Sequence, residues 1–193
     1  MERKTLVRVL AISGSLRRSS SNTALLAAAA QLAPADVGIA LFGGLAALPP
    51  FNPDVDQTGV PVSVNEFRKQ LHACDAVLIS SPEYAHGVPG VLKNALDWIV
   101  GSGELVGKPV GLINASARAT FAWTSLVETL TVMWGRIVPD ASITVPLHGS
   151  SLNATTIAAD FAPAASLRQA TQALATAARE ASPRPQDETR VVP

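Results

Sequence analysis

The sequence predicts an α/β fold in which helices cover both faces of a five-stranded parallel sheet, with the strands in the order 2-1-3-4-5. Short β-branched runs alternate with helical segments along the chain, which is typical of such a three-layer sandwich. Apolar residues make up 48% of the chain and charged residues 16%, and this balance suits a sheet buried on both faces. The length of 193 residues fits a single core.

The first half of the chain begins with the pattern strand, loop, helix. A β-branched run over residues 5–13 predicts the first strand, and an Ala- and Leu-rich run over 24–32 predicts a helix that begins near Asn22. Residues 37–42 form the second predicted strand. Residues 43–61 are dense in Gly, Pro, Asn and Asp, so we expect a long loop there, of the kind that often covers a site.

The same alternation continues in the second half of the chain. The remaining predicted elements are a helix at 62–74, a strand at 76–80, a helix between Pro89 and Trp98, a strand at 109–115, a helix at 124–135, a strand at 137–145 and a helix at 164–180. We expect residues 1–181 to form one domain. Residues 182–193 are rich in proline and charge, so we expect a disordered tail there.

Charge and cysteine content exclude several classes of function. Lys plus Arg number 15 and Asp plus Glu also number 15, so no basic field exists to attract a nucleic acid. The single cysteine, Cys74, has no disulfide partner within the chain, and we expect it to lack cationic neighbours, so we expect a structural thiol in a cytoplasmic protein. The N-terminal apolar run is too short to span a membrane, and we expect no anchoring or export signal.

The loop after the first predicted strand carries the chemistry of a phosphate site. Residues 13–23 read SGSLRRSSSNT, which gathers hydroxyls, an amide and guanidinium groups just before a helix N-terminus. Arg17 can add a charge-assisted hydrogen bond to a dianion, and Gly14 allows the backbone to approach closely. A Ser-rich loop with an ordinary helix cap is the competing interpretation. Neither a dinucleotide fingerprint nor an NTPase phosphate loop is present.

The loop after the third predicted strand is the second candidate. It reads SSPEYAHGVPG over residues 80–90 and places an aromatic ring, a carboxylate and an imidazole between two prolines. In a sheet of order 2-1-3-4-5, ligands bind beyond the carboxyl ends of the first and third strands. We therefore expect the two loops to form one site.

Together these loops resemble those of a known family. The segments GSLRRSSSN at 14–22 and SPEYAHGVPGVLKNALDW at 81–98 resemble the motifs of the NADPH-dependent FMN reductase family, which includes quinone and chromate reductases. The segment LPPFNP at 48–53 is similar to a third family element, and the resemblance extends over residues 6–145. It implies a flavodoxin-like fold, an FMN cofactor, NADPH or NADH as co-substrate, and a homodimer or homotetramer.

The resemblance also assigns residues, none of them a catalytic acid, base, nucleophile or metal ligand. Those expected to bind the FMN phosphate are Ser15, Arg17, Ser21, Asn22 and Thr23. Those expected beside the ribityl chain and the ring are Pro82, Glu83, Tyr84 and Ala85, with Ser116 at the ring edge. The implied reaction is a ping-pong transfer of hydride from NAD(P)H to a small acceptor such as a quinone, a flavin, an azo compound or a metal oxyanion.

Several residues near these motifs keep more than one interpretation. Arg118 could meet a nucleotide phosphate, pair with an acid or lie in solvent, and we favour solvent. His86 could donate a proton to an acceptor, although a solvated side chain is the more common case. Capping, helix packing or a subunit contact explains Lys93, Asn94 and Asp97 as well as catalysis does, and we assign none of them to chemistry. We expect Trp98 and Trp134 to be packing anchors, whereas the role of Trp123 is left open.

Two other functions compete with the reductase. A flavodoxin-type electron carrier would bind FMN and exchange single electrons with protein partners, but such carriers are usually acidic and this chain is neutral. A domain that binds a phosphorylated metabolite without flavin would need only the Ser-rich loop. We favour the enzyme.

Overall fold

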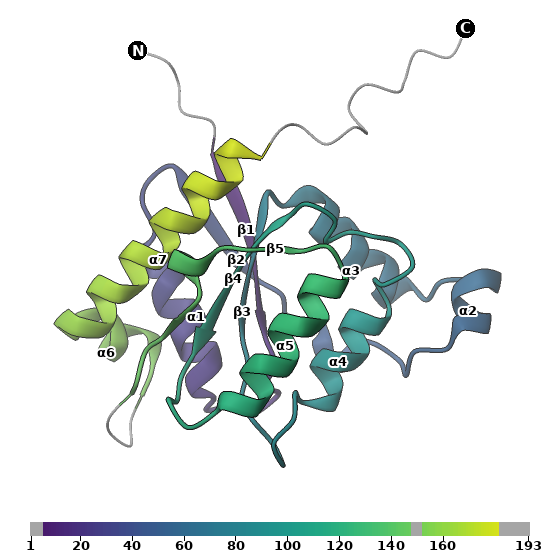
Figure 1. Cartoon of the computed structure of the whole chain (residues 1–193), viewed down its shortest axis with the longest axis horizontal. Coiled ribbons are helices and arrows are strands. Elements are labelled where there is room, and N and C mark those ends of the chain that lie inside the picture. The colour runs from purple at the N-terminus through teal and green to yellow at the C-terminus, as the bar shows by residue number, and fades with distance from the viewer. Residues whose placement is uncertain (1–5, 148–151, 182–193) are drawn as a thin grey trace, which may run out of the picture.

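The computed structural model describes residues 6–147 and 152–181, and it shows a parallel sheet at the centre of the chain (Figure 1). The strands lie in the order β2-β1-β3-β4-β5, with β6 also paired to β4. This confirms the predicted α/β fold and strand order. The strands are β1 (Val7–Ser13), β2 (Val37–Leu41), β3 (Ala76–Ser80), β4 (Pro109–Asn114), β5 (Arg136–Ile137) and β6 (Ile143–Thr144).

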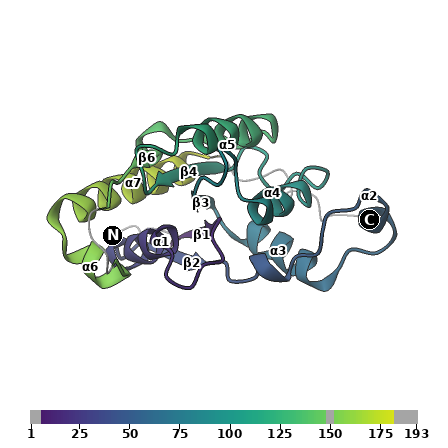
Figure 2. The ribbon, with the colours of Figure 1, turned by 90° about the horizontal axis from the view of Figure 1, so that it is seen from below.

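Helices cover both faces of the sheet, as Figure 2 shows from below. One face carries α1 (Ser21–Leu32), α6 (Ala154–Ala159) and α7 (Phe161–Glu180). The other carries α3 (Val62–Ala73), α4 (Gly90–Asp97) and α5 (Thr120–Val132). Three short helices complete the described chain: η1 (Leu45–Ala47), α2 (Pro53–Thr58) and η2 (Pro139–Ala141).

Alternate residues of each central strand enter the two cores. In β3, Val77 and Ile79 pack with the α3, α4 and α5 side, whereas Ala76 and Leu78 pack with the α1 and α7 side. All five residues of β3 are buried. A strand buried on both faces reads as a continuous apolar run, which is why the central strands are recognisable in the sequence.

The predicted fifth strand over 137–145 is wrong as one continuous element. The structure divides it into β5 and β6, which pair with opposite ends of β4 and are separated by the turn η2. Pro139 opens that turn and has no N–H for a ladder bond. Gly111 makes room for it, because a Cβ at this glycine would lie 2.9 Å from the Ala141 carbonyl oxygen.

Other segments also differ from the predicted boundaries. The connection over 43–61 is not a plain loop, since it contains η1 and α2. Helix α5 begins at Thr120 rather than Thr124, and α6 was not predicted. The predicted tail at 182–193 lies outside the described residues, so the division into one domain over 1–181 and a tail stays our proposal. None of the described helices is both long enough and apolar enough to cross a membrane.

Candidate functional site

Three loops meet at one edge of the sheet, beyond the carboxyl ends of β1, β3 and β4. Strands β1 and β3 are parallel neighbours with Ser13 opposite Ser80, and the Gly14 N–H donates to the Ser80 carbonyl at 2.8 Å. The loops that follow these strands therefore start side by side, at the lower edge of the sheet in Figure 1. This is the edge where open α/β sheets bind ligands.

Gly14 permits a close approach between the first two loops. A Cβ at this position would lie 2.7 Å from the Ser81 Oγ and 3.1 Å from the Leu92 Cδ2. No side chain fits within those distances unless its neighbours move. The sequence suggested that this glycine opens space for a ligand, and the structure shows that it first lets the two loops touch.

The first loop presents cationic and polar groups at the N-terminus of α1. The Ser20 hydroxyl caps the helix by accepting from the Thr23 N–H at 3.3 Å, and no acidic residue lies in the first turn. Ser21, the first residue of the helix, is half-buried, and Arg17 is exposed. Within residues 6–147 and 152–181, neither Arg17 nor Arg18 has a carboxylate partner. A helix N-terminus beside unpaired guanidinium groups attracts an anion.

Three of the predicted phosphate residues are also engaged with the protein. The Ser15 Oγ accepts from the Arg17 N–H at 3.3 Å and shapes the loop. The Thr23 hydroxyl lies 2.7 Å from that of Ser13. Asn22 is buried, and its Oδ1 accepts from the Ser80 hydroxyl at 2.9 Å. Two of the five predicted residues, Ser15 and Arg17, thus lie in the loop, and the other three lie in the first turn of α1. Their contacts give Ser15, Asn22 and Thr23 a positioning role.

The second loop is tied to the start of α5. Pro82 and Glu83 are half-buried, whereas Tyr84 and Ala85 are exposed. The Glu83 Oε2 accepts from the Ala122 N–H at 2.9 Å. Helix α5 has no side-chain cap of its own, so this carboxylate occupies the capping position from outside the helix. The sequence had placed Glu83 beside the flavin and did not show this bond.

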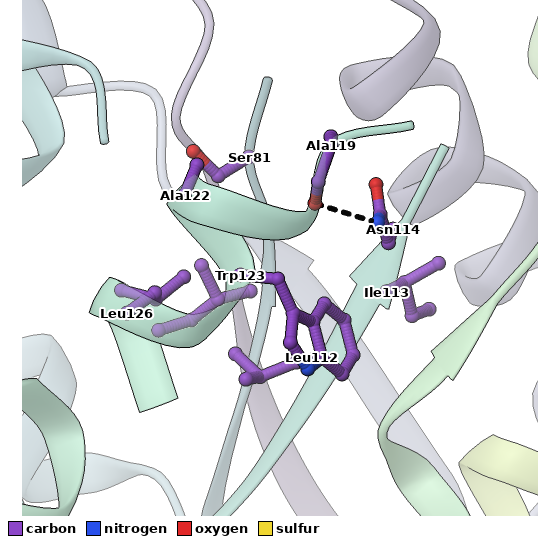
Figure 3. Close-up of a pocket in the computed structure, with 9 residues that line it drawn as sticks. Ser81, Leu112, Ile113, Asn114, Ala119, Ala122, Trp123 and Leu126 are labelled. Atoms are coloured by element: carbon purple, nitrogen blue, oxygen red, sulfur yellow. Dashed lines mark hydrogen bonds between the residues drawn. The ribbon is translucent and has the colours of Figure 1, made fainter. Parts of the chain in front are cut away.

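The third loop, after β4, is shaped by Asn114. The Asn114 Oδ1 accepts from the Ser116 N–H at 3.1 Å, and its Nδ2 donates to the Ala119 carbonyl at 3.2 Å, a bond drawn in Figure 3. The Ser116 Oγ accepts from the Arg118 N–H at 3.3 Å. Arg118 itself is exposed and has no acidic partner among the described residues.

A small pocket lies between this loop and α5. Trp123 lines it together with Ser81, Leu112 and Leu126, and Figure 3 shows these side chains around one space. Its volume of about 10 Å³ holds no more than one water molecule. Trp123, whose role the sequence left open, is half-buried against the core beside the third loop.

The motif residues on α4 hold the loop at 49–51. The Asn94 side chain accepts from the Phe51 N–H at 2.7 Å and donates to the Pro49 carbonyl at 2.9 Å. The indole N–H of Trp98 donates to the same carbonyl at 2.8 Å. Lys93 pairs with Asp97 along the helix. Trp98 is thus the anchor we predicted, and Asn94 fixes a neighbouring loop.

The surroundings of two single residues differ from our expectation. Trp134 is not a packing anchor within its own chain, because 75% of its surface is exposed. Cys74 does have a cationic neighbour: the buried Lys108 Nζ lies 3.6 Å from its Sγ and donates to the carbonyls of Leu71 and Cys74. Lys108 lies far from Cys74 in sequence. The contact forms because the end of α3, at Cys74, lies beside the start of β4, at Lys108.

The donor set fits the phosphate end of FMN. Exposed guanidinium groups, a half-buried hydroxyl and a helix N-terminus without nearby acids are the groups that bind a dianionic phosphate. Across residues 6–147 and 152–181, no group of three His, Cys, Asp or Glu side chains could hold a metal ion. FMN, when bound through its phosphate at these groups, would supply redox chemistry.

Comparisons with known proteins agree with this site. The model of the NADPH-dependent FMN reductase family matches residues 7–148, which include all three loops. The NAD(P)H-dependent FMN reductase PA1204 of Pseudomonas aeruginosa is 43% identical over 113 residues, which cover 58% of this chain and 60% of that protein. The quinone reductase of Escherichia coli K12 is 37% identical over 114 residues, with the same coverage. The matched chain thus spans about 60% of the length of these relatives.

A solved structure shows the same fold over nearly the whole chain. FerB, a flavoenzyme NAD(P)H:(acceptor) oxidoreductase from Paracoccus denitrificans, superposes with a TM-score of 0.78 at 26% identity. The superposition covers 91% of this chain and 99% of that one.

Proposed function

This chain belongs to the NADPH-dependent FMN reductase family, and we propose that it is an FMN-dependent NAD(P)H oxidoreductase acting on a small acceptor. The acceptors that we propose are a quinone, a flavin, an azo compound or a metal oxyanion. The relatives support this proposal, since they are named for FMN and quinone reduction. The observation that carries it is the meeting of three loops at one sheet edge, beside guanidinium groups that have no carboxylate partner among the described residues.

In this proposal the residues of the chain bind and position the cofactor. Arg17 and Ser21 would hold the phosphate, while Asn22 and Thr23 keep the first loop in place through Ser80 and Ser13. FMN, when bound, would accept a hydride from NAD(P)H and pass electrons to the acceptor, so the protein needs no nucleophile. Successive use of one site by both substrates gives a ping-pong order, which parallel lines in double-reciprocal rate plots would support.

The second and third loops would line the rest of the cofactor. Pro82, Tyr84 and Ala85 belong to a loop whose position is set by the bond between Glu83 and Ala122. Ser116 lies in the loop after the neighbouring strand. Backbone groups of these loops would face the polar edge of the ring, and this is the part of the proposal that rests on the family resemblance.

The spectrum of the purified full chain tests the proposal. FMN is added, the excess is removed, and NADPH is then added without oxygen. A retained flavin band that bleaches supports the reductase. A retained band that NADPH leaves unchanged favours a flavodoxin-type carrier, and a protein that retains no flavin overturns both. Initial rates with NADH and NADPH then identify the preferred co-substrate.

We also propose a homodimer or homotetramer. Four exposed apolar side chains, those of Val100, Val106, Val132 and Trp134, border one groove between α4 and α5. Trp134 has a φ of 61°, a conformation that costs a residue with a side chain free energy, and no burial within the chain offsets this cost. The groove also carries charges of both signs, so it could face a second copy of itself. Sedimentation of Trp134→Ser tests this, because a monomeric variant supports it and an unchanged mass overturns it.

The cytoplasmic location stays part of the proposal. It rests on a single cysteine that is buried, which suits a reducing compartment.

A further inference from the structure

The second loop ends in a strained turn. The N–H of Tyr84 donates to the Gly87 carbonyl at 3.1 Å, and the Gly87 N–H donates back at 2.9 Å. The two central residues, Ala85 and His86, have φ angles of 49° and 60°. Positive φ at both central positions is the signature of a type I′ turn, which favours Asn-Gly. Alanine is disfavoured in this conformation, and histidine adopts a positive φ more often than most residues but less readily than glycine.

The strain fixes the imidazole of His86 against a ring from another segment. The His86 and Phe121 rings are stacked, with centroids 4.3 Å apart and planes at 14°. Phe121 belongs to the first turn of α5. Its neighbour Ala122 donates its N–H to the Glu83 carboxylate, so the second loop contacts the start of α5 at two adjacent positions.

Burial does not explain this ring pair. Phe121 remains 56% exposed although the imidazole covers one of its faces, and His86 is exposed as well. If the strained turn served to stabilise the fold, it would be expected to bury apolar surface and so to offset the strain. Instead, the ring surface that the turn holds stays exposed to solvent. Strained backbone that holds an exposed group is a feature of binding and active sites.

The ring pair also connects the loops that follow two neighbouring strands. His86 lies in the loop after β3, and Phe121 follows the loop after β4. The proposed cofactor ring lies between these same loops. Because an acceptor would approach the proposed cofactor ring between these loops, the two side chains would present ring faces to it.

We propose that His86 and Phe121 form a stacking platform that selects flat aromatic acceptors, such as quinones, over acceptors that cannot stack. The proposal rests on the proposed function and identifies the residues that determine its specificity. An aromatic ring gains attraction from an exposed ring face beyond the area that it buries. Neither residue takes part in the redox step itself.

Phe121→Leu tests the platform, with Phe161→Leu as the matched control. Phe161 is also exposed, at 87%, but it begins α7 and belongs to none of the three loops. The acceptors are 1,4-naphthoquinone, which is flat, and ferricyanide, which is octahedral and cannot stack. We expect Phe121→Leu to lower the ratio of kcat/KM for naphthoquinone to that for ferricyanide by about two- to tenfold. Phe161→Leu leaves this ratio unchanged, and Phe121→Tyr restores it.

His86→Gly separates binding from folding. Glycine relieves the positive φ and removes the ring, so we expect the melting temperature to rise by about 2–4 °C while the same acceptor ratio falls. A fall in the melting temperature would mean that the ring pair holds the fold together, and this overturns the proposal. Equal losses with both acceptors, or weaker FMN binding by Phe121→Leu, overturn it too.

A binding measurement gives a readout that does not depend on turnover. Saturation-transfer NMR follows 1,4-dimethoxynaphthalene, a flat compound that does not accept hydride under these conditions. We expect wild-type protein to bind it and Phe121→Leu to bind it more weakly, and equal binding overturns the platform. A wild-type protein that binds this compound but retains no FMN would contradict the proposed function and support the platform.

Discussion

The Ser80 hydroxyl donates a hydrogen bond of 2.9 Å to the Asn22 Oδ1, and this bond joins the end of β3 to the first turn of α1. Ser80 is fully buried and Asn22 is 7% exposed. The bond links the first turn of α1 to Ser80, the residue after which the second of the three loops begins, so it fixes the helix N-terminus relative to that loop. The position of the α1 N-terminus therefore depends on a residue of β3.

We expect Asn22→Ala to destabilise the chain and to weaken FMN binding together. The substitution leaves the buried Ser80 hydroxyl without its acceptor, which costs about 1–3 kcal/mol of unfolding free energy. Urea denaturation measures this cost, and flavin fluorescence measures the affinity. Ser80→Ala is the matched variant and should cost a similar amount, because it leaves the buried Asn22 Oδ1 without its donor. An unchanged unfolding free energy in Asn22→Ala would contradict this account.

Arg17→Ala should weaken FMN binding without changing the fold. Arg17 is exposed and has no ion pair within the described part of the chain, so its removal breaks no internal contact. A charge-assisted hydrogen bond of about 1.5–3 kcal/mol corresponds to a loss of affinity of roughly ten- to a hundredfold. Arg8→Ala is the control, since Arg8 pairs with Asp75 at the other end of β1. Equal FMN affinities of the two variants would exclude Arg17 from the phosphate site.

Asn94→Ala should release the loop at 49–51. The Phe51 N–H then loses its acceptor, and the Pro49 carbonyl keeps only the bond from Trp98. We expect amide exchange at Phe51 to become at least about tenfold faster, because a lost bond of roughly 1.4 kcal/mol corresponds to that factor. Lys93→Ala, one position earlier on α4, should leave this rate unchanged. The prediction fails if Phe51 exchanges at the same rate in both variants.

Lys108→Met should destabilise the core at the end of α3. The Lys108 side chain is buried, and its Nζ donates to the carbonyl of Cys74 at 3.0 Å and to that of Leu71. Methionine keeps the apolar stem but leaves these carbonyls without the donor, at a cost of about 2–3 kcal/mol. Chemical denaturation compares it with Lys69→Met on the exposed face of α3. Similar stabilities of the two variants would refute a capping role for Lys108.

Local patterns were enough to predict the central strands and the loops of the site. The strand at 76–80 matches β3 residue for residue, because its burial on both faces leaves a continuous apolar run. The helix at 62–74 agrees with α3 to within one residue for a related reason, since Val64, Phe67 and Leu71 recur at helical spacing and are all buried. Periodicity of this kind is carried by neighbouring residues and needs no knowledge of the fold.

Segments held by distant partners were predicted less well. The strand at 137–145 breaks at Pro139, and the turn fits only because Gly111 of β4 lacks a side chain. Trp134 is a large aromatic residue of the kind that usually packs into a core, but the sequence around it does not show that it lies outside both cores. Each outcome depends on a neighbour that tertiary structure supplies.

The sequence by itself determined the fold class, the strand order and the loops that carry the candidate site, since these follow from apolar periodicity and from motifs of adjacent residues. Only the tertiary structure decided how those loops are held: Asn22 on Ser80, Glu83 on the α5 N-terminus, and His86 on Phe121. Each of these contacts joins residues at least 35 positions apart, and their distance and direction are set by the packed sheet and helices. The spacing of neighbouring apolar residues predicts the individual strands and helices, whereas the contacts between these elements exist only after the chain has folded.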